Sequence, residues 1–388
     1  MQEVIRLKFL AFTEAPDEVI TEAEMKLISL NPDLKFERVE ENADGVYFVS
    51  GGSENFARES LLPSEINILI AGKENNAWAA ATEVKAWASQ HDLQSVLISA
   101  DEPNFVVHLH QYVMIKQSYT RLKGQRLGLI GEVSDWLIAS SFTPELVMQK
   151  FGLELLQYSY GDLPDYLSFP DDKEFSAMFP SLQSQQKELT SISSFLKNTI
   201  AVNHLDGLTI QCFRMVRERG VTACLPVGML NSKGLPVGCE GDLVSIFSIM
   251  LMKELIGQIA WMANLVSLNE ESILLAHCTA PLKPSTLYQI KTHYETDISS
   301  AICAKLEMDV VTIFRINNSL DQAFVAEGFV IDRPEYPWAC RTQLEVSISH
   351  EDICKLNEKP LGNHHLVLMG RHAAYIRRAL QVKQVAFV

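Results

Sequence analysis

The residues of this chain best suited to chemistry lie in the run Gly238-Cys239-Glu240-Gly241-Asp242. A short extended stretch over 235–238 precedes this run and apolar residues at helical spacing follow it, which predicts a strand-to-helix turn. Acids are favoured at a helix N-terminus, so Asp242 is expected to cap the helix. The glycines permit a sharp turn and close backbone packing around Glu240. Glu240 is therefore the first candidate functional carboxylate, and an ordinary first-turn acid is the alternative.

Three further polar residues share with Glu240 a position at the end of a predicted strand or in the turn after one: Asn264, His277 and His365. Open α/β folds place ligand-binding groups at such positions. One glutamate and two histidines would suit Mn²⁺ or a similar divalent cation. In the pair His364-His365, adjacent strand residues point to opposite faces, so at most one is expected to face a given site. Spacing alone does not bring these residues together, and each histidine could instead be structural.

Composition and charge exclude several classes of function. The chain has 388 residues, of which 47% are hydrophobic and 21% are charged, and this is typical of a globular protein with two or three domains. The formal net charge of −15 argues against non-specific binding of nucleic acid or of an anionic membrane. The apolar run over 243–265 contains Lys253 and Glu254, so it is predicted to be a helix leading into a strand and not a membrane span.

Cysteine usage and the first residues predict the compartment. The seven cysteines form no CxxC pair, and most lie in apolar runs such as Ala223-Cys224-Leu225. They are expected to be reduced and buried. The start of the sequence has no basic region followed by an apolar one, which predicts that there is no signal peptide. A cytoplasmic protein is the expectation.

The first two thirds of the chain alternate strands with helices. Strand, small-residue turn and helix in succession predict an open parallel sheet. Strands are expected over 6–12, 45–50, 66–71 and 95–99, with helices over 18–30, 78–90 and 106–121. A second unit restarts near Lys123-Gly124-Gln125, with strands over 126–130 and 207–212, a helix over 188–203 and a loop or insertion over 163–181. The chain has no GxGxxG or GxxxxGK[ST] motif, so the turn Gly51-Gly52-Ser53 is interpreted as an ordinary βα turn.

The pattern changes after residue 256, and Pro281-Leu282-Lys283-Pro284 is interpreted as a boundary. Strands are expected over 258–266, 272–277, 298–306, 310–316, 322–331, 343–348 and 366–369, followed by a helix over 373–380. The predicted fold class is α/β, with two Rossmann-like α/β units followed by a β-rich, barrel-like C-terminal domain. The predicted domains are 1–124, 125–275 with the Glu240 run, and 276–388.

Four segments in order resemble the L-fucose and L-arabinose isomerase superfamily: Gly234 to Leu243, Ile259-Ala260-Trp261-Met262-Ala263-Asn264, Leu275-Ala276-His277-Cys278, and Gly362-Asn363-His364-His365-Leu366. The resemblance covers roughly residues 205–388 well and the two amino-terminal units more loosely. It implies a fucose isomerase-like fold and the activity of an aldose–ketose isomerase. In that family a divalent metal, usually Mn²⁺, binds O1 and O2 of an open-chain sugar, and two carboxylates shuttle a proton through an enediol.

The resemblance assigns roles to individual residues of this chain. Glu240 matches the first carboxylate, and the second falls at Asn264 or Ala263. His365 and His277 match metal-binding histidines. Gln211 corresponds to a sugar-contacting glutamine, and Asn363 and His364 are further expected sugar contacts. The implied partner is a small-molecule sugar, and the protein could be a homo-oligomer.

The chain departs from the family pattern at Asn264. An amide oxygen can bind a metal, but an amide cannot take up a proton near neutral pH. Asp242 is then a candidate replacement for the missing acid–base group. Three hypotheses stay open: a metal-dependent isomerase, a catalytically impaired relative that binds a sugar, and a two-lobed periplasmic-type sugar-binding protein. The expected lack of a signal peptide argues against the third.

Overall fold

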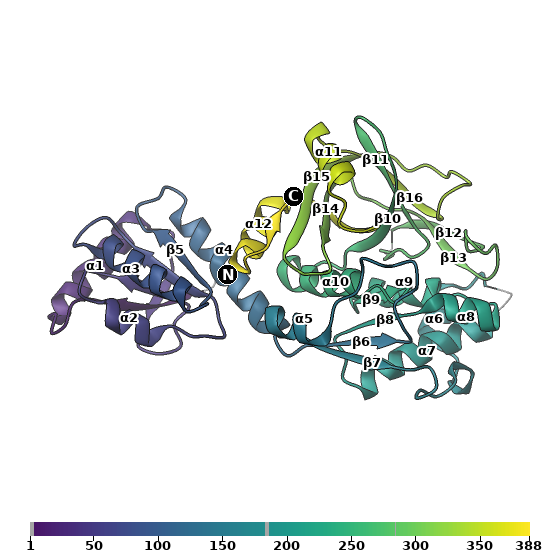
Figure 1. Cartoon of the computed structure of the whole chain (residues 1–388), viewed down its shortest axis with the longest axis horizontal. Coiled ribbons are helices and arrows are strands. Elements are labelled where there is room, and N and C mark those ends of the chain that lie inside the picture. The colour runs from purple at the N-terminus through teal and green to yellow at the C-terminus, as the bar shows by residue number, and fades with distance from the viewer. Residues whose placement is uncertain (1–3, 183–185, 284) are drawn as a thin grey trace. The chain divides into compact units, whose positions relative to one another are not determined.

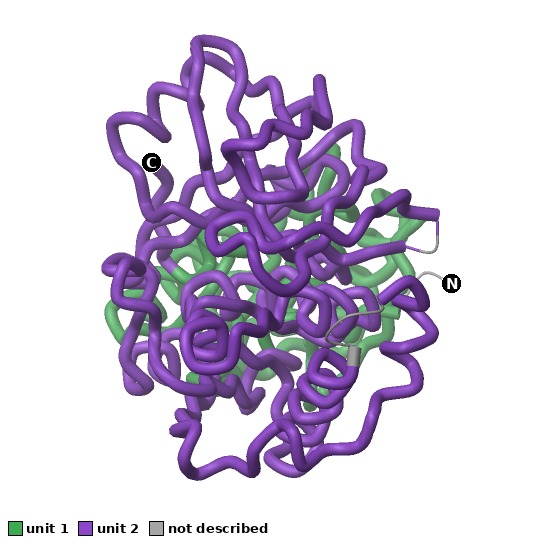
Figure 2. The backbone as a smooth tube through the Cα atoms, turned by 90° about the vertical axis from the view of Figure 1, so that its right-hand side faces the viewer, with its two compact units in different colours: residues 1–120, 378–383 green, residues 121–377, 384–388 purple. Residues whose placement is uncertain are grey.

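The structure is a computed structural model that describes residues 4–182, 186–283 and 285–388, so Pro284 of the predicted boundary lies outside the described residues. The chain divides into two compact units (Figure 2). The first comprises residues 1–120 and 378–383, and the second comprises 121–377 and 384–388. Each unit is described by itself.

The first unit contains a parallel sheet of five strands in the order β2-β1-β3-β4-β5. The strands are β1 (Ile5–Leu10), β2 (Phe36–Arg38), β3 (Gly45–Phe48), β4 (Asn67–Ala71) and β5 (Ser95–Ser99). The helices are α1 (Asp17–Leu30), α2 (Glu54–Ser60), α3 (Ala77–Gln90) and α4 (Phe105–Leu122). All residues of β3 and β4 are buried, as expected for strands covered on both faces. The alternation of strands and helices in the sequence therefore predicted this parallel sheet correctly.

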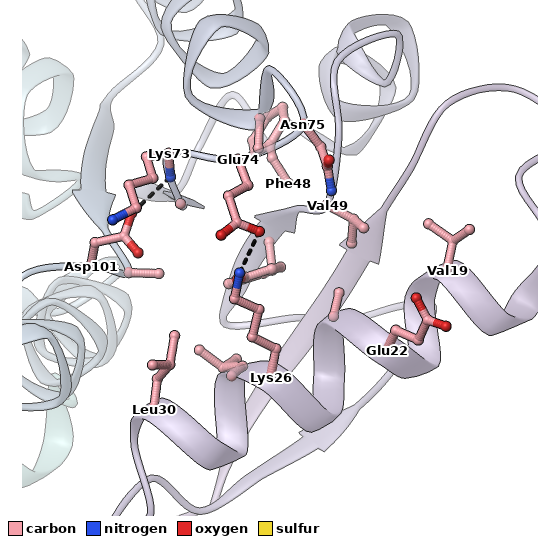
Figure 3. Close-up of a pocket in the computed structure, with 16 residues that line it drawn as sticks. Val19, Glu22, Lys26, Leu30, Phe48, Val49, Lys73, Glu74, Asn75 and Asp101 are labelled. Atoms are coloured by element: carbon pink, nitrogen blue, oxygen red, sulfur yellow. Dashed lines mark hydrogen bonds and ion pairs between the residues drawn. The ribbon is translucent and has the colours of Figure 1, made fainter.

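A pocket lies at the carboxyl edge of this first sheet, bordered by α1 and the turn after β4 (Figure 3). In it Lys26 pairs with Glu74, and the backbone N–H of Lys73 donates a hydrogen bond to Asp101. None of the site residues predicted from the sequence lines this pocket.

The second unit contains a parallel sheet of four strands in the order β7-β6-β8-β9 (Figure 1). The strands are β6 (Arg126–Ile130), β7 (Glu154–Tyr158), β8 (Gly207–Ile210) and β9 (Val237–Cys239). The helices are α5 (Pro144–Phe151), α6 (Lys173–Met178), α7 (Gln186–Val202), α8 (Cys212–Arg219), α9 (Cys224–Ser232) and α10 (Leu243–Ile256), with a 3₁₀ turn at Tyr166–Ser168. The predicted loop over 163–181 therefore contains helical segments. Among the described residues, no helix is long and apolar enough to cross a membrane.

The rest of the second unit is mainly a closed antiparallel barrel of six strands in the order β14-β17-β10-β11-β16-β15, which β14 and β15 close by pairing with each other (Figure 1). The barrel strands are β10 (Trp261–Leu268), β11 (Ser272–His277), β14 (Val310–Ile316), β15 (Gln322–Asp332), β16 (Thr342–Ser347) and β17 (His364–Met369). Also present are the hairpin β12 (Leu287–Lys291) and β13 (Ala301–Lys305), the helix α11 (His350–Glu358) and β18 (Ala386–Phe387), together with α12 (Ala373–Val382), whose residues from 378 onward belong to the first unit. The predicted barrel-like, β-rich architecture is confirmed.

The barrel begins at Trp261, ahead of the predicted domain boundary at 275. Strands β10 and β11 pair with β17 and β16 from the far end of the chain. Such long-range pairing leaves no local mark in the sequence, and the apolar run that continues from α10 into β10 hides the transition. The three-domain division stays a prediction.

Candidate metal and sugar site

Glu240 lies at the carboxyl end of β9, in a backbone conformation that the surrounding turn imposes. Its φ is 63°, and Gly241 follows with a φ of 70°, in the left-handed region that favours glycine. A Cβ atom on Gly241 would lie 2.3 Å from the backbone oxygen of Glu132. The backbone oxygen of Glu240 accepts a hydrogen bond of 3.0 Å from the N–H of Ser134. The turn after β6 thus packs directly on the Glu240 turn, which only a glycine at 241 permits.

The Glu240 carboxylate is buried and has partners at both oxygens. Oε1 lies 3.5 Å from Nε2 of His277 and 3.6 Å from Nε2 of His364. Oε2 accepts a hydrogen bond of 2.8 Å from Nε1 of Trp136. Burial by itself raises the pKa of Glu240, but the charge of His364 and the close approach of both histidine rings outweigh it and hold the pKa well below 4.5. Glu240 is therefore an ionised carboxylate at neutral pH.

His277 closes one side of this group from the end of β11. Its Nε2 lies 3.8 Å from Sγ of Cys239, and its Nδ1 lies 2.9 Å from Oγ1 of Thr279, which fixes the ring. Burial lowers the pKa of His277, so the ring is neutral at pH 7. The hydrogen bond with Cys212 raises the pKa of the Cys239 thiol, and burial raises it further. Cys239 is therefore a neutral thiol.

Asp242 and His364 form the other side of the group. Asp242 is fully buried, and its Oδ1 accepts a hydrogen bond of 2.6 Å from the N–H of Ser245, which makes it the cap of α10, as predicted. Its Oδ2 lies 2.8 Å from Nδ1 of His364 and 3.6 Å from the Arg315 guanidinium. This arrangement differs from the expectation that Asp242 replaces a catalytic carboxylate, because both of its oxygens are engaged away from any open surface.

The contact with Asp242 turns Nε2 of His364 toward Glu240. This nitrogen is buried and has no hydrogen-bond partner in the part of the chain that the structure describes. Burial alone lowers the pKa of His364, but Glu240 and Asp242 together outweigh it and raise the pKa to about 9. The ring is therefore protonated at pH 7, and a metal ion at Nε2 would have to displace that proton.

The structure places His364, and not His365, beside Glu240. Nδ1 of His365 lies 3.2 Å from the backbone oxygen of Asn363, and its ring lies 6.1 Å from the ring of Phe324. Burial lowers the pKa of His365 to about 3, helped by the nearby Arg315, so this ring is neutral. The exchange of roles between the two histidines follows from strand geometry, because successive side chains point to opposite faces. The assignment of His365 as a metal ligand thus has no geometric support at Glu240.

Asn264 and Gln211 come from strands next to those that carry the Glu240 group. Asn264 pairs with His364 across the β10–β17 ladder, and its Oδ1 accepts a hydrogen bond of 3.0 Å from Nδ2 of Asn363. Gln211 follows β8, the strand next to β9, and its Oε1 accepts a hydrogen bond of 3.2 Å from the N–H of Glu132. Asn264 thus lies in the middle of β10 and Asn363 just before β17, both in the barrel, whereas Gln211 follows β8 of the parallel sheet; their grouping around one site stays a prediction.

The residues at this site fit a divalent metal ion. Single ligand atoms of Cys239, Glu240 and His277 all lie within 4.8 Å of one another. Together with Nε2 of His364 they offer a carboxylate oxygen, two imidazole nitrogens and a thiol sulfur. Carboxylate and imidazole suit Mn²⁺ or Zn²⁺, and the thiol would favour softer ions. The identity of the ion stays a prediction.

Sequence reasoning missed two contributors to the site. Trp136 donates to Glu240 from the turn after β6, and its ring packs edge-on against Phe213 at 4.8 Å. Arg315 is almost fully buried beside Asp242. A signal for Trp136 existed, because the turn over 131–136 follows a parallel strand and must lie at the same sheet edge as Glu240. Arg315 lies inside an apolar strand pattern with no comparable signal.

Comparison with known proteins gives a distant similarity to sugar isomerases. No protein-family model matches the chain. Proteins named sulfoquinovose isomerase from Priestia aryabhattai and from Priestia megaterium (strain ATCC 12872 / QMB1551) are each 24% identical to it over 280 residues. The match covers 67% of this chain and 62% of each relative. The chain is therefore distantly similar to sugar isomerases and matches less than two thirds of their length.

Proposed function

We propose that this protein is a metal-dependent aldose–ketose isomerase that acts on an open-chain sugar through an enediol. One observation carries the proposal: an ionised, buried Glu240 carboxylate lies between two histidines at the carboxyl end of a parallel strand. The distant similarity to sulfoquinovose isomerases supports the reaction class. Sulfoquinovose itself is therefore one of the sugars to test.

Isomerisation of an aldose to a ketose moves one proton from C2 to C1 and one from O2 to O1. A base next to C2 must take up the first proton and return it to C1. Glu240 is available for this role because it is ionised at neutral pH, and the Trp136 N–H orients its Oε2. Protonated Glu240 then delivers the same proton to C1, so the carboxylate is regenerated.

Glu240, His277 and His364 would hold the metal ion, with Cys239 beside them as a neutral thiol, and His364 would give up the proton at Nε2 on binding. When bound, the ion would polarise the sugar oxygens and lower the cost of removing the C2 proton. Asp242 keeps His364 oriented through the 2.8 Å contact at Nδ1. Gln211, Asn264 and Asn363 would bind sugar hydroxyls through their amide groups. Mn²⁺ is the ion that we propose.

Asn264 supports a second candidate, a sugar-binding protein without turnover. If the second catalytic carboxylate of the isomerases corresponds to Asn264, this chain has one acid–base group fewer. Asp242 does not replace it, because both of its oxygens are engaged with Ser245, His364 and Arg315. Glu240 alone would then have to remove the proton from C2 and return it to C1.

The test measures metal content and turnover of the purified full chain. We expect about one Mn²⁺ per chain and ketose formation from at least one aldose in a panel that includes sulfoquinovose. Glu240→Gln should lower turnover by about 10²–10⁴-fold, the usual contribution of a general base. Glu335→Gln is the matched control, because Glu335 is exposed and forms ion pairs with Lys291 and Lys305. Equal turnover of Glu240→Gln and the wild type would contradict the proposal, and saturable sugar binding without product would favour the second candidate.

A further inference from the structure

The loop over 292–300, which joins β12 and β13, is tied to both parts of the second unit that build the candidate site. On the barrel side, the N–H of Ile302 donates a hydrogen bond of 3.0 Å to the backbone oxygen of Cys278, the residue that follows β11. On the side of the parallel sheet, Oγ1 of Thr222, between α8 and α9, donates a hydrogen bond of 2.6 Å to the backbone oxygen of Ser300. The loop therefore bridges the barrel and the α/β part of the second unit next to the site.

His293 brings this loop against the residues that orient Glu240. Its ring packs edge-on against the ring of Phe213, with ring centres 5.5 Å apart. Phe213 in turn packs against Trp136, whose N–H donates to Glu240. His293 is buried, and its Nδ1 lies 3.0 Å from Oγ1 of Thr296. The loop is thus held in place beside the indole that contacts Glu240.

Glu295 is a second carboxylate beside the site. Its Oε2 lies 3.9 Å from Nε2 of His293, and 46% of its side chain is exposed. Burial lowers the pKa of His293 to about 4, so this ring is neutral at pH 7 and supplies no positive charge to Glu295. Partial burial and the charge of Glu240 raise the pKa of Glu295 above 4.5, against the opposing effect of His364. The two carboxylates are therefore close enough for one charge to affect the other, and their environments shift their pKa values in opposite directions.

The proposed isomerase reaction needs an acid–base group for the oxygen atoms as well as one for the carbon atoms. Asn264 is an amide, and both oxygens of Asp242 are engaged, so neither residue can move the oxygen-bound proton. We propose that Glu295 is the second catalytic acid–base group and moves a proton between O2 and O1 of the sugar, an inference that rests on the proposed function. Its half-exposed side chain can meet a sugar that arrives from solvent.

The protons and electrons balance with these two carboxyl groups. Glu240 takes the proton from C2, the C2–H electron pair forms the C1–C2 double bond, and the π pair of C1–O1 moves to O1. Protonated Glu295 gives its proton to O1, which completes the enediol. In the second half Glu295 takes the proton from O2, the C2–O2 double bond forms, and the C1–C2 π pair takes the proton from Glu240. Both carboxyl groups return to their starting states.

The test measures Mn²⁺ content and ketose formation by the full chain, on every aldose of the panel that the wild type converts, beginning with sulfoquinovose. Glu295→Gln should lower kcat by about 10²-fold or more, the usual contribution of a positioned acid–base group. Its KM and Mn²⁺ content should stay within about twofold of the wild type, because the lost interaction acts on proton transfer. Asp297→Asn is the matched control, since Asp297 is an exposed carboxylate of the same loop and asparagine tolerates its φ of 54°. The control should keep the kcat of the wild type.

Rescue with formate separates proton transfer from a structural role of Glu295. The side chain is half-exposed, so formate can enter the space that Glu295→Ala vacates. Formate should raise the kcat of Glu295→Ala by about tenfold or more, a part of the contribution of the lost acid–base group. Formate should not change the kcat of Asp297→Asn.

The outcomes distinguish this inference from the proposed function. Wild-type kcat in Glu295→Gln would overturn the inference and leave the isomerase proposal standing. Loss of Mn²⁺ from Glu295→Gln would make Glu295 a metal ligand and would equally overturn it. So would a loss of kcat in Glu295→Ala that formate does not restore, which would assign Glu295 a structural role. A wild-type chain that forms no ketose from any aldose of the panel would overturn both proposals.

Discussion

His364 and His365 are adjacent in sequence, yet the structure predicts opposite responses to pH when each is replaced by glutamine in the metal-free protein. The pKa of His364 is raised from 6.5 to about 9, because the charges of Glu240 and Asp242 outweigh burial. A shift of this size corresponds to roughly 3 kcal/mol of net stabilisation of the protonated ring in the folded protein. Because the folded-state pKa is raised, this stabilisation is fully present below pH 6.5 and is lost as the pH rises through about 9.

His365 has the reverse effect, since burial lowers its pKa from 6.5 to about 3. The folded protein then binds fewer protons than the unfolded chain, so the wild type loses stability as the pH falls below 6.5. That loss should reach about 2 kcal/mol at pH 5, where the unfolded-state imidazole is charged. As the pH falls from 8 to 5, the stability of His365→Gln should therefore rise relative to that of the wild type. The stability of His364→Gln should be furthest below that of the wild type at pH 5 to 7.

The assay is urea unfolding of both variants and the wild type in chelator at pH 5 to 9, followed by Mn²⁺ titration at pH 7. The difference in pH slope is the readout, because a constant packing loss shifts each curve without changing its slope. Mn²⁺ affinity should fall by about tenfold or more in His364→Gln and by no more than about threefold in His365→Gln. Parallel pH profiles, or a larger loss of Mn²⁺ affinity in His365→Gln, would refute the assignment of His364 to the site.

Three other predictions concern Asn264, Gly241 and Asp172. Asn264→Asp should bind Mn²⁺ more tightly than the wild type by calorimetry, because it adds a carboxylate at the edge of the site; equal affinity would place Asn264 outside the coordination shell. Gly241→Ala should cost about 3 kcal/mol or more in urea unfolding, since φ is 70° and the new Cβ would lie 2.3 Å from the Glu132 backbone oxygen. Asp172→Ala should cost about 1–2 kcal/mol, because Asp172 caps α6 and pairs with Lys197 at 2.8 Å. Burial raises the pKa of Asp172, but hydrogen bonds, led by the one from Lys197, lower it overall. The cost of Asp172→Ala should therefore be present above pH 3.8 and disappear as the pH falls through the lowered pKa. A cost that does not change with pH would contradict the ion-pair contribution.

The sequence by itself determined the two kinds of sheet and many of the local elements, although β2, β7, β12 and α11 were not predicted. Strands β5, β6, β11 and β14 have the predicted bounds, because each is a short run of β-branched or apolar residues between turn residues. The alternation of strands and helices sufficed for the parallel sheets, since a parallel connection needs a crossover helix. Asp242 could likewise be predicted as a cap, because capping depends on residues three positions apart.

Only the tertiary structure decided how the candidate site is assembled. Glu240, His277 and His364 come from β9, β11 and β17, and the barrel closes through strand pairs that are far apart in sequence. Which of two adjacent histidines faces Glu240 depends on strand register, and a slip of one residue would exchange them. Trp136 and Arg315 reach the site through contacts across the fold, at 2.8 Å to Glu240 and 3.6 Å to Asp242. Such contacts depend on three-dimensional packing, which leaves no periodic pattern along the chain.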